Sequence, residues 1–145
     1  MDFGLSPEQE MLKDAVARCL AETCPLDHVR ACADAGTAVS EAVGAALSTM
    51  GLTGLMIPEA HGGLGLPLLD AVVVAEELGR AVAPVPFLAR SALAPLAMTL
   101  AGSNEQQARW LPLIASGDAR FGVAISGIVE RRDGSTVRAD GNGLS

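Results

Sequence analysis

The chain has 145 residues, enough for one ordinary domain that buries about 70% of the surface its unfolded form exposes. Half of the residues are hydrophobic, which excludes intrinsic disorder over most of the length. Ten basic and seventeen acidic residues give a net charge of -7, with Lys13 as the only lysine, so nucleic acid is not an expected partner.

The cysteines and the N-terminal segment indicate a reduced, cytoplasmic protein. Cys19, Cys24 and Cys32 form neither a C-x-x-C pair nor a metal-binding spacing with a histidine. The start of the chain lacks the cationic and apolar regions of a secretory signal. The longest apolar runs, 64–75 and 93–101, are shorter than the ~20 residues of a membrane span. Neither export nor a membrane partner is expected.

Three helices are predicted in the N-terminal part. Ser6 and Gln9, with a proline between them, have the pattern of a capping box at a helix start. An amphipathic helix follows and ends before Pro25. Two shorter helices are predicted over 27–35 and 39–50, each closed by a glycine.

The central and later parts predict three more helices. Residues 52–65 are rich in glycine and predict a structured loop with a brief extended apolar strip at its centre. Residues 68–79 are apolar enough to predict a central helix that is buried on most sides. A helix over 87–101 is expected to kink at Pro95. A second capping box then starts a helix that Pro112 is expected to distort.

After the last helix, the hydrophobic period changes from 3.6 to 2. This alternation predicts short strands over 121–126, 128–130 and 135–139, and a further turn at 140–143. Two or three short strands are marginal alone and leave open edges. We therefore expect either the front part of a longer protein or a subunit whose sheet is completed elsewhere.

The candidate chemical features are mostly interpreted as structural. Glu76 and Glu77 are helix neighbours that point about 100° apart, so one solvated carboxylate and one at a helix or subunit seam near Arg80 are expected rather than a catalytic pair. His28 and His61 have no Ser, Cys or carboxylate partner at an informative spacing, so both are expected at the surface or in loops.

Two further features have simple explanations as well. The glycines of 62–65 lack the third glycine of a dinucleotide fingerprint and the lysine of a P-loop, so they predict a turn rather than a nucleotide site. Trp110 is expected to contribute packing. Residue chemistry alone predicts a mostly helical domain with the start of a β-region.

Four stretches are informative through their order. They are the Leu-Ser-x-Glu-Gln start within 3–9, the Gly-Leu-Thr-Gly-Leu-Met-Ile-Pro-Glu segment within 51–65, Glu-Glu-Leu-Gly-Arg at 76–80, and 101–118. In this order they resemble the N-terminal part of acyl-CoA dehydrogenases. The resemblance implies a mainly α fold, with an N-terminal helical bundle over 1–118 and the first few β-strands of an incomplete middle β-domain over 119–145.

The resemblance also implies a function. Members of this family are oligomeric FAD enzymes of lipid metabolism, including fatty-acid β-oxidation, that catalyse α,β-dehydrogenation of an acyl-CoA thioester. A carboxylate removes the α-proton, and the β-hydride passes to the flavin. The family's glutamate base belongs to a C-terminal helical domain that is not in this sequence, so no residue here is assigned as catalytic. The chain alone is expected to be inactive, with itself or a related dehydrogenase chain as its partner.

Four candidate site residues follow from the resemblance. The strand expected over 121–126 resembles the one beside the flavin, so Ile125 and Ser126 are predicted to bind FAD; an ordinary strand-end hydroxyl is the alternative for Ser126. The helix expected over 87–101 resembles the one that lines the acyl pocket. Ala89 and Leu93 are therefore predicted to bind substrate, with core packing as the alternative.

The sequence after Ser126 departs from the family pattern, which normally continues with Glu-Pro. The leading hypothesis is a part or subunit of an FAD-dependent acyl-CoA dehydrogenase. The alternative is a non-catalytic helical partner subunit of a heteromeric dehydrogenase that has lost flavin contacts. A stand-alone four-helix ligand-binding domain is a third hypothesis, which leaves the terminal strands unexplained.

Overall fold

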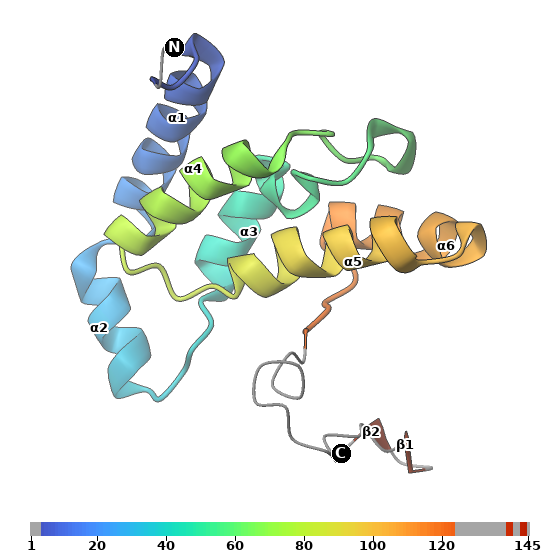
Figure 1. Cartoon of the computed structure of the whole chain (residues 1–145). Coiled ribbons are helices and arrows are strands. Elements are labelled where there is room, and N and C mark those ends of the chain that lie inside the picture. Colours follow the sequence, from blue (N-terminus) through green and yellow to red (C-terminus); the bar gives the residue numbers. More distant parts are fainter. Residues whose placement is uncertain (1–3, 124–138, 141–142, 145) are drawn as a thin grey trace, which may run out of the picture.

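The computed structural model describes residues 4–123, 139–140 and 143–144, and helices make up most of the first of these segments (Figure 1). In this segment the elements are α1 Pro7–Thr23, α2 Leu26–Asp34, α3 Glu41–Thr49, η1 Leu52–Gly54, η2 Glu59–His61, α4 Leu68–Arg80, η3 Leu88–Leu93, α5 Ala94–Ala101 and α6 Asn104–Ser116. None of the helices in the described part of the chain combines the length and apolar character that crossing a bilayer requires.

Both predicted capping boxes are present. Ser6 Oγ accepts a hydrogen bond from the Gln9 backbone N–H at 3.2 Å, and Gln9 Oε1 accepts one from the Ser6 N–H at 3.0 Å. The same reciprocal pair starts α6, where Ser103 and Gln106 exchange bonds of 3.2 and 2.8 Å. Each box satisfies two backbone donors near the helix start, which explains why the starts of α1 and α6 were predictable.

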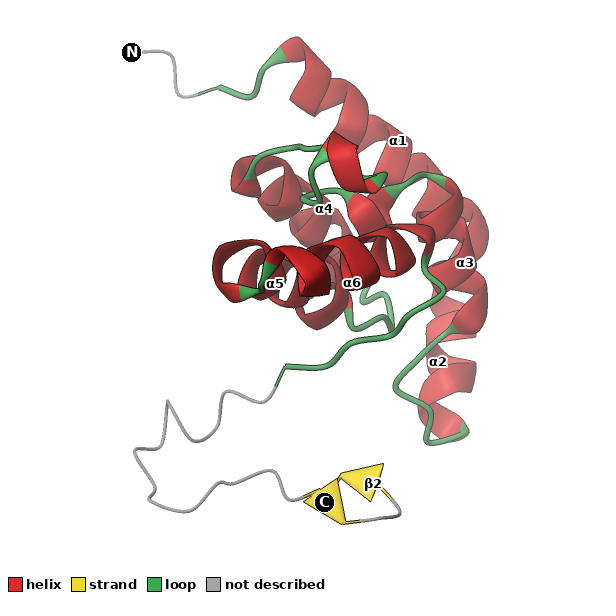
Figure 2. Cartoon of the chain, turned by 90° about the vertical axis from the view of Figure 1, so that its right-hand side faces the viewer, coloured by secondary structure: helices red, strands yellow, loops and turns green. Residues whose placement is uncertain are grey.

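The main core forms where α1, α3 and α4 pack together with η1. Its buried side chains are Val16, Leu20, Cys24, Val43, Leu47, Leu52, Leu55, Ala71, Val74, Leu78 and Phe87. A smaller cluster of Ile57, Leu111 and Ile114 attaches α6 to the loop after η1. The helices α5 and α6 lie side by side in both views (Figure 1, Figure 2). The fold is therefore a helical bundle with a main and a secondary apolar cluster.

The prediction that the central helix is buried on most sides is wrong. In α4, Leu68 is 56% exposed, Leu69 54% and Val72 44%. The buried residues of α4 lie on one face, and the helix contacts α1 and η3, so the apolar side chains on its other face are open to solvent. We call Leu68, Leu69 and Val72 the α4 apolar face.

The buried side of α4 includes two carboxylates. Glu77 is 5% exposed and pairs with Arg80 at 3.3 Å, while Glu76 is exposed, which confirms the predicted division between these neighbours. Asp70, 7% exposed, accepts a hydrogen bond of 2.8 Å from Gln9 Nε2 on α1. The amide of Gln9 therefore caps α1 through its oxygen and binds α4 through its nitrogen.

The segment expected to form one kinked helix is helical from residue 87 to 101, but its first part is π-helical. Residues Leu88–Leu93 form the π-helical η3, and α5 follows with Pro95 in its first turn. The Pro95 ring cannot donate to the Ser91 carbonyl and would collide with it in a continuous α-helix. The wider π-turn avoids this collision and places the proline where no N–H donor is required. In contrast, α6 continues through Pro112 without interruption.

The loop before α4 folds back on itself and contains no extended strip, contrary to the prediction. Leu64 N–H donates to the Gly54 carbonyl at 3.0 Å, and Gly65 N–H donates to the Ile57 carbonyl at 2.8 Å. The same two carbonyl oxygens lie close to Gly63. A Cβ atom on Gly63 would be 2.1 Å from the Ile57 oxygen and 2.6 Å from the Gly54 oxygen. Only glycine therefore permits this approach of two backbone segments.

The predicted β-domain is not shown. Residues 121–123 of the first expected strand have no regular structure, and 124–138, which include the rest of it, lie outside the described residues. The strands β1 Ala139–Asp140 and β2 Gly143–Leu144 form a two-residue antiparallel pair around the predicted turn. This pair is too short to establish a sheet.

Candidate functional site

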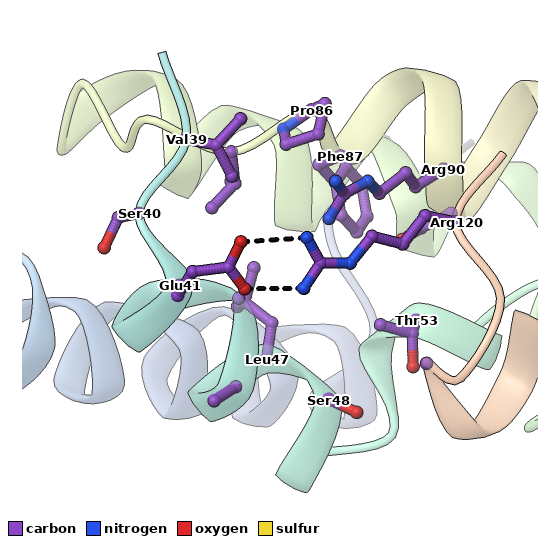
Figure 3. Close-up of a pocket in the computed structure, with 15 residues that line it drawn as sticks. Val39, Ser40, Glu41, Leu47, Ser48, Thr53, Pro86, Phe87, Arg90 and Arg120 are labelled. Carbon is purple, nitrogen blue, oxygen red and sulfur yellow. Dashed lines mark hydrogen bonds and ion pairs between the residues drawn. The ribbon is translucent and has the colours of Figure 1, made fainter. Parts of the chain in front are cut away.

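A cavity of about 220 Å³ opens between α3, the segment from residue 85 to 91, and the turn after α6 (Figure 3). Its charged side chains are Glu41, Arg90 and Arg120, and they lie among apolar walls. The apolar wall residues are Val39, Leu47, Val85, Pro86 and Phe87. The cavity therefore combines a charged group with an apolar lining, as small-molecule sites do.

Ser40 fixes one side of this cavity. Its hydroxyl accepts a hydrogen bond of 3.2 Å from the Val43 N–H and so caps the start of α3. Its own N–H donates to the Pro84 carbonyl at 2.8 Å. The start of α3, where Glu41 lies, is thus held against the segment that leads into η3.

The turn after α6 forms the opposite side. Gly117 ends α6 with a φ of +83°, a left-handed conformation that glycine adopts readily. The Ala119 N–H then donates to the Leu113 carbonyl at 2.9 Å. Further on, Phe121 packs edge-to-face on Trp110, with 5.4 Å between the ring centroids, which confirms the packing role predicted for Trp110. These contacts direct the chain back toward α3.

Arg120 and Glu41 form a two-point ion pair across the cavity (Figure 3). Arg120 Nη1 lies 2.9 Å from one carboxylate oxygen, and Nη2 lies 2.7 Å from the other. Hydrogen bonds from Arg120, its charge and then the charge of Arg90 hold the pKa of the Glu41 carboxyl below its usual range. The pair joins residues 79 positions apart and closes one side of the cavity.

We expect the Glu41→Gln variant to unfold at a lower temperature than the parent chain at pH 7. Because the pKa of Glu41 is lowered on folding, its contribution is complete above the unfolded-state pKa of about 4.3. The contribution is lost as pH falls through the folded-state pKa, so the two unfolding temperatures should converge in acid. Thermal denaturation from pH 7 to pH 3 measures this. Glu22→Gln, on an exposed part of α1, is the control, and a constant difference at all pH values would contradict the assignment.

Arg90 is the second cation of the cavity. It is half-buried, and its guanidinium points into the cavity near the ion pair (Figure 3). Within residues 4–123, this guanidinium has no hydrogen bond or ion pair, whereas Arg120 binds both oxygens of Glu41. The two arginines and one glutamate give the cavity a net positive charge, although the whole chain carries -7.

The predicted substrate residues do not line this cavity. Ala89 and Leu93 are half-buried on η3, whereas Arg90 and Ser91, between them in the sequence, are lining residues. The substrate role of Ala89 and Leu93 stays a prediction. The predicted FAD residues, Ile125 and Ser126, lie outside the described residues.

His28 has partners that the sequence analysis missed. Its Nε2 lies 2.8 Å from Ser40 Oγ and 3.7 Å from Cys32 Sγ, so the prediction of an isolated histidine is wrong. The spacing of four residues between His28 and Cys32 on α2 was a usable signal, whereas the contact with Ser40 depends on how α2 packs. Since the Ser40 hydroxyl is buried and caps α3, we interpret the group as structural.

The other cysteines of the described part contribute packing, and no metal site accompanies them there. Cys24 is buried in the main core, and burial, followed by the nearby Cys32, raises the pKa of its thiol. Cys19 is half-buried. Among the described residues, no group of three or more His, Cys, Asp or Glu side chains could hold a metal ion.

Comparison with known proteins gives a consistent result. Residues 6–118 match the model of the family described as acyl-CoA dehydrogenase, N-terminal domain. The chain is 37% identical over 116 residues to (2S)-methylsuccinyl-CoA dehydrogenase of Cereibacter sphaeroides, covering 79% of this chain and 21% of that protein. It is 31% identical over 143 residues to acyl-CoA dehydrogenase FadE27 of Mycobacterium tuberculosis, covering 99% and 38%.

A solved structure extends the similarity to the fold. The ChsE4-ChsE5 complex from Mycobacterium tuberculosis contains a chain that matches with a TM-score of 0.82 and 28% identity, covering 99% of this chain and 39% of that one. The chain therefore spans between 21% and 39% of the length of these three relatives.

Proposed function

Because this chain belongs to the acyl-CoA dehydrogenase family, we propose that it is the N-terminal part, or a subunit, of an FAD-dependent acyl-CoA dehydrogenase. The proposed reaction is α,β-dehydrogenation of an acyl-CoA thioester. The observation that carries the proposal is the match of the helical domain over residues 6–118. It is supported by the fold similarity to the ChsE4-ChsE5 complex over 99% of the chain.

We further propose that the chain contributes part of the enzyme and requires more protein for activity. In this proposal, residues 1–118 are the helical domain and 119–145 begin the β-domain. The helical domain contributes one wall of the acyl site through η3, including Ala89 and Leu93. The catalytic base is supplied by protein beyond these 145 residues. Purified alone, the chain should not oxidise an acyl-CoA.

The cavity between α3 and η3 is too small for FAD. Its volume of about 220 Å³ is below the ~300–1,000 Å³ that is typical of sites for drug-sized ligands. We therefore place the flavin contact outside it, at Ile125 and Ser126, in the segment predicted from the family resemblance. There the Ser126 hydroxyl forms a hydrogen bond with the flavin. When bound, FAD supplies the oxidant for dehydrogenation.

Two observations favour a second function, that of a non-catalytic partner subunit of a heteromeric dehydrogenase. The solved relative with the TM-score of 0.82 is part of a complex of two named proteins. In addition, the α4 apolar face leaves three large side chains between 44% and 56% exposed, which is typical of a surface that another protein covers.

The two functions are distinguished by purifying the chain alone and together with a longer acyl-CoA dehydrogenase chain. Flavin absorbance, with activity toward an electron-accepting dye only in the assembled protein, supports the dehydrogenase proposal. A colourless chain in a stoichiometric complex supports the partner subunit. Turnover by the isolated chain would contradict the proposal that it is incomplete.

We expect the Ser126→Ala variant to retain less flavin than the parent chain. The loss of one hydrogen bond worth about 1 kcal/mol corresponds to roughly a fivefold weaker affinity. Flavin absorbance per protein after gel filtration measures the occupancy. Ser126→Thr keeps the hydroxyl and is the matched control. Equal occupancy in the alanine and threonine variants would remove Ser126 from the proposed FAD site.

A further inference from the structure

We propose that the cavity between α3 and η3 binds a carboxylate on a short aliphatic chain, held by Arg90 and Ser91. These two neighbours lie on the π-helical segment η3 and both line the cavity. Single π-turns are rare and often occur at functional sites. The identification of the ligand as part of an acyl thioester rests on the proposed function. The recognition of a carboxylate by Arg90 and Ser91 does not depend on it.

The charge of Arg90 is unpaired among the described residues. A half-buried guanidinium loses part of its hydration and usually has a partner. Within residues 4–123 the Arg90 guanidinium makes no hydrogen bond or ion pair, and Glu41, which feels its charge, binds Arg120 at 2.9 and 2.7 Å. The five donors of the Arg90 guanidinium are therefore free to bind an anion. Their planar geometry matches a carboxylate.

Ser91 offers a second donor, independent of Arg90. This residue is 3% exposed and lines the same cavity, yet its hydroxyl has no hydrogen-bond partner among the described residues. The hydroxyl oxygen itself is not fully buried, so it is open to the cavity. A ligand oxygen in the cavity gives Ser91 an acceptor. Two donors that have no partner in the described part of the chain, one charged and one neutral, thus border the same cavity.

The walls and the volume identify the rest of the ligand. Val39, Leu47, Val85 and Phe87 offer an apolar surface that an inorganic anion would leave unused. The cavity volume of about 220 Å³ is smaller than the ~300 Å³ lower limit of typical drug-sized sites. A short aliphatic carboxylate satisfies both the charge and the walls. Its source is either a free acid or the terminal carboxylate of an acyl thioester.

Pentanoate and its neutral analogue pentanamide test the carboxylate. Calorimetric titration of the full chain should show pentanoate binding at least tenfold more tightly than pentanamide. In Arg90→Gln this preference should disappear, and Ser91→Ala should weaken pentanoate binding several-fold. Glu41→Gln should tighten it, because a competing carboxylate is removed and Arg120 is freed. Arg109→Gln, which changes an exposed arginine over Trp110, is the control and should behave like the parent.

A loss of pentanoate binding can be distinguished from misfolding of a variant and from failure of the proposed function. Retained pentanamide binding in Arg90→Gln shows that the cavity is intact, and Arg90→Lys keeps the charge should the glutamine variant not fold. Equal binding of pentanoate and pentanamide to the parent, or pentanoate binding that is unchanged in Arg90→Gln, would overturn the inference. The measurements need neither FAD nor a partner, so a failure of the proposed function leaves them valid.

Competition experiments distinguish the source of the carboxylate. If glutaryl-CoA displaces pentanoate and pentanoyl-CoA does not, the terminal carboxylate of an acyl thioester is the ligand. If neither displaces it, a free short-chain acid is the ligand, and carboxylate recognition stands. Equal displacement by both thioesters would show that the cavity does not select a terminal carboxylate, and would contradict the inference.

Discussion

Replacing Gly63 with alanine should destabilise the chain by about 3–5 kcal/mol, a large fraction of a typical domain stability. The added Cβ would lie 2.1 Å from the Ile57 oxygen and 2.6 Å from the Gly54 oxygen, both of which are backbone atoms that cannot rotate away. The loop must therefore open, which also separates Ile57 from Leu111 in the smaller cluster. Urea denaturation measures the loss.

The matched control is Gly79→Ala in α4. A Cβ at this position meets no atom within 4 Å. Alanine also favours helix over glycine by up to about 1 kcal/mol. This variant should be as stable as the parent or more stable. An unchanged urea midpoint for Gly63→Ala would show that the loop can relax around a methyl group.

The second large effect is expected for Gln9→Glu, at about 2–3 kcal/mol of destabilisation at pH 7. The substitution keeps the oxygen that accepts the Ser6 N–H, so the cap of α1 remains. It removes the donor to Asp70 and places a second carboxylate beside that buried acid. The penalty should decrease in acid, because protonation of the introduced carboxyl removes the repulsion and restores a donor.

The two capping boxes provide the control for this prediction. Gln106→Glu makes the same change in α6, where the described residues give the Gln106 amide nitrogen no acidic partner. We expect this variant to lie within about 0.5 kcal/mol of the parent. Urea denaturation of both variants at pH 7 and pH 4 measures the effects. Equal destabilisation by the two substitutions would assign the effect to the caps rather than to Asp70.

Local features were predictable from the sequence, because they depend on neighbouring residues. The cap formed by Ser6 and Gln9 is one case, and the contrast between Glu76 and Glu77 is another. The π-turn was not predictable, although Pro95 correctly marked the place where a regular helix fails. The error at α4 has a related cause, since an apolar run shows that a surface avoids water but does not show whether this chain covers it.

The candidate site depends on distant contacts, so the sequence did not predict it. Glu41 and Arg120 are 79 positions apart, and no spacing rule joins them. Ser40 and His28 meet only because α2 packs near the start of α3. Family resemblance identified the segment around Ala89 and Leu93 but not the charged cavity beside it, which requires the side-chain positions of three separate segments.

The double use of the Gln9 amide makes the start of α1 part of a cooperative unit. Helix ends normally fray, so their amide protons exchange with solvent without global unfolding. Here the same side chain also binds Asp70 on α4, so an opening that displaces Gln9 breaks both bonds. The first turn of α1 should therefore open together with α4, and its amide protons should exchange slowly. The Gln106 amide of α6 has no such second partner among the described residues; the start of α6 is joined instead to α5, through Gln107 Nε2 and the Thr99 carbonyl at 3.2 Å, and should open independently of α4.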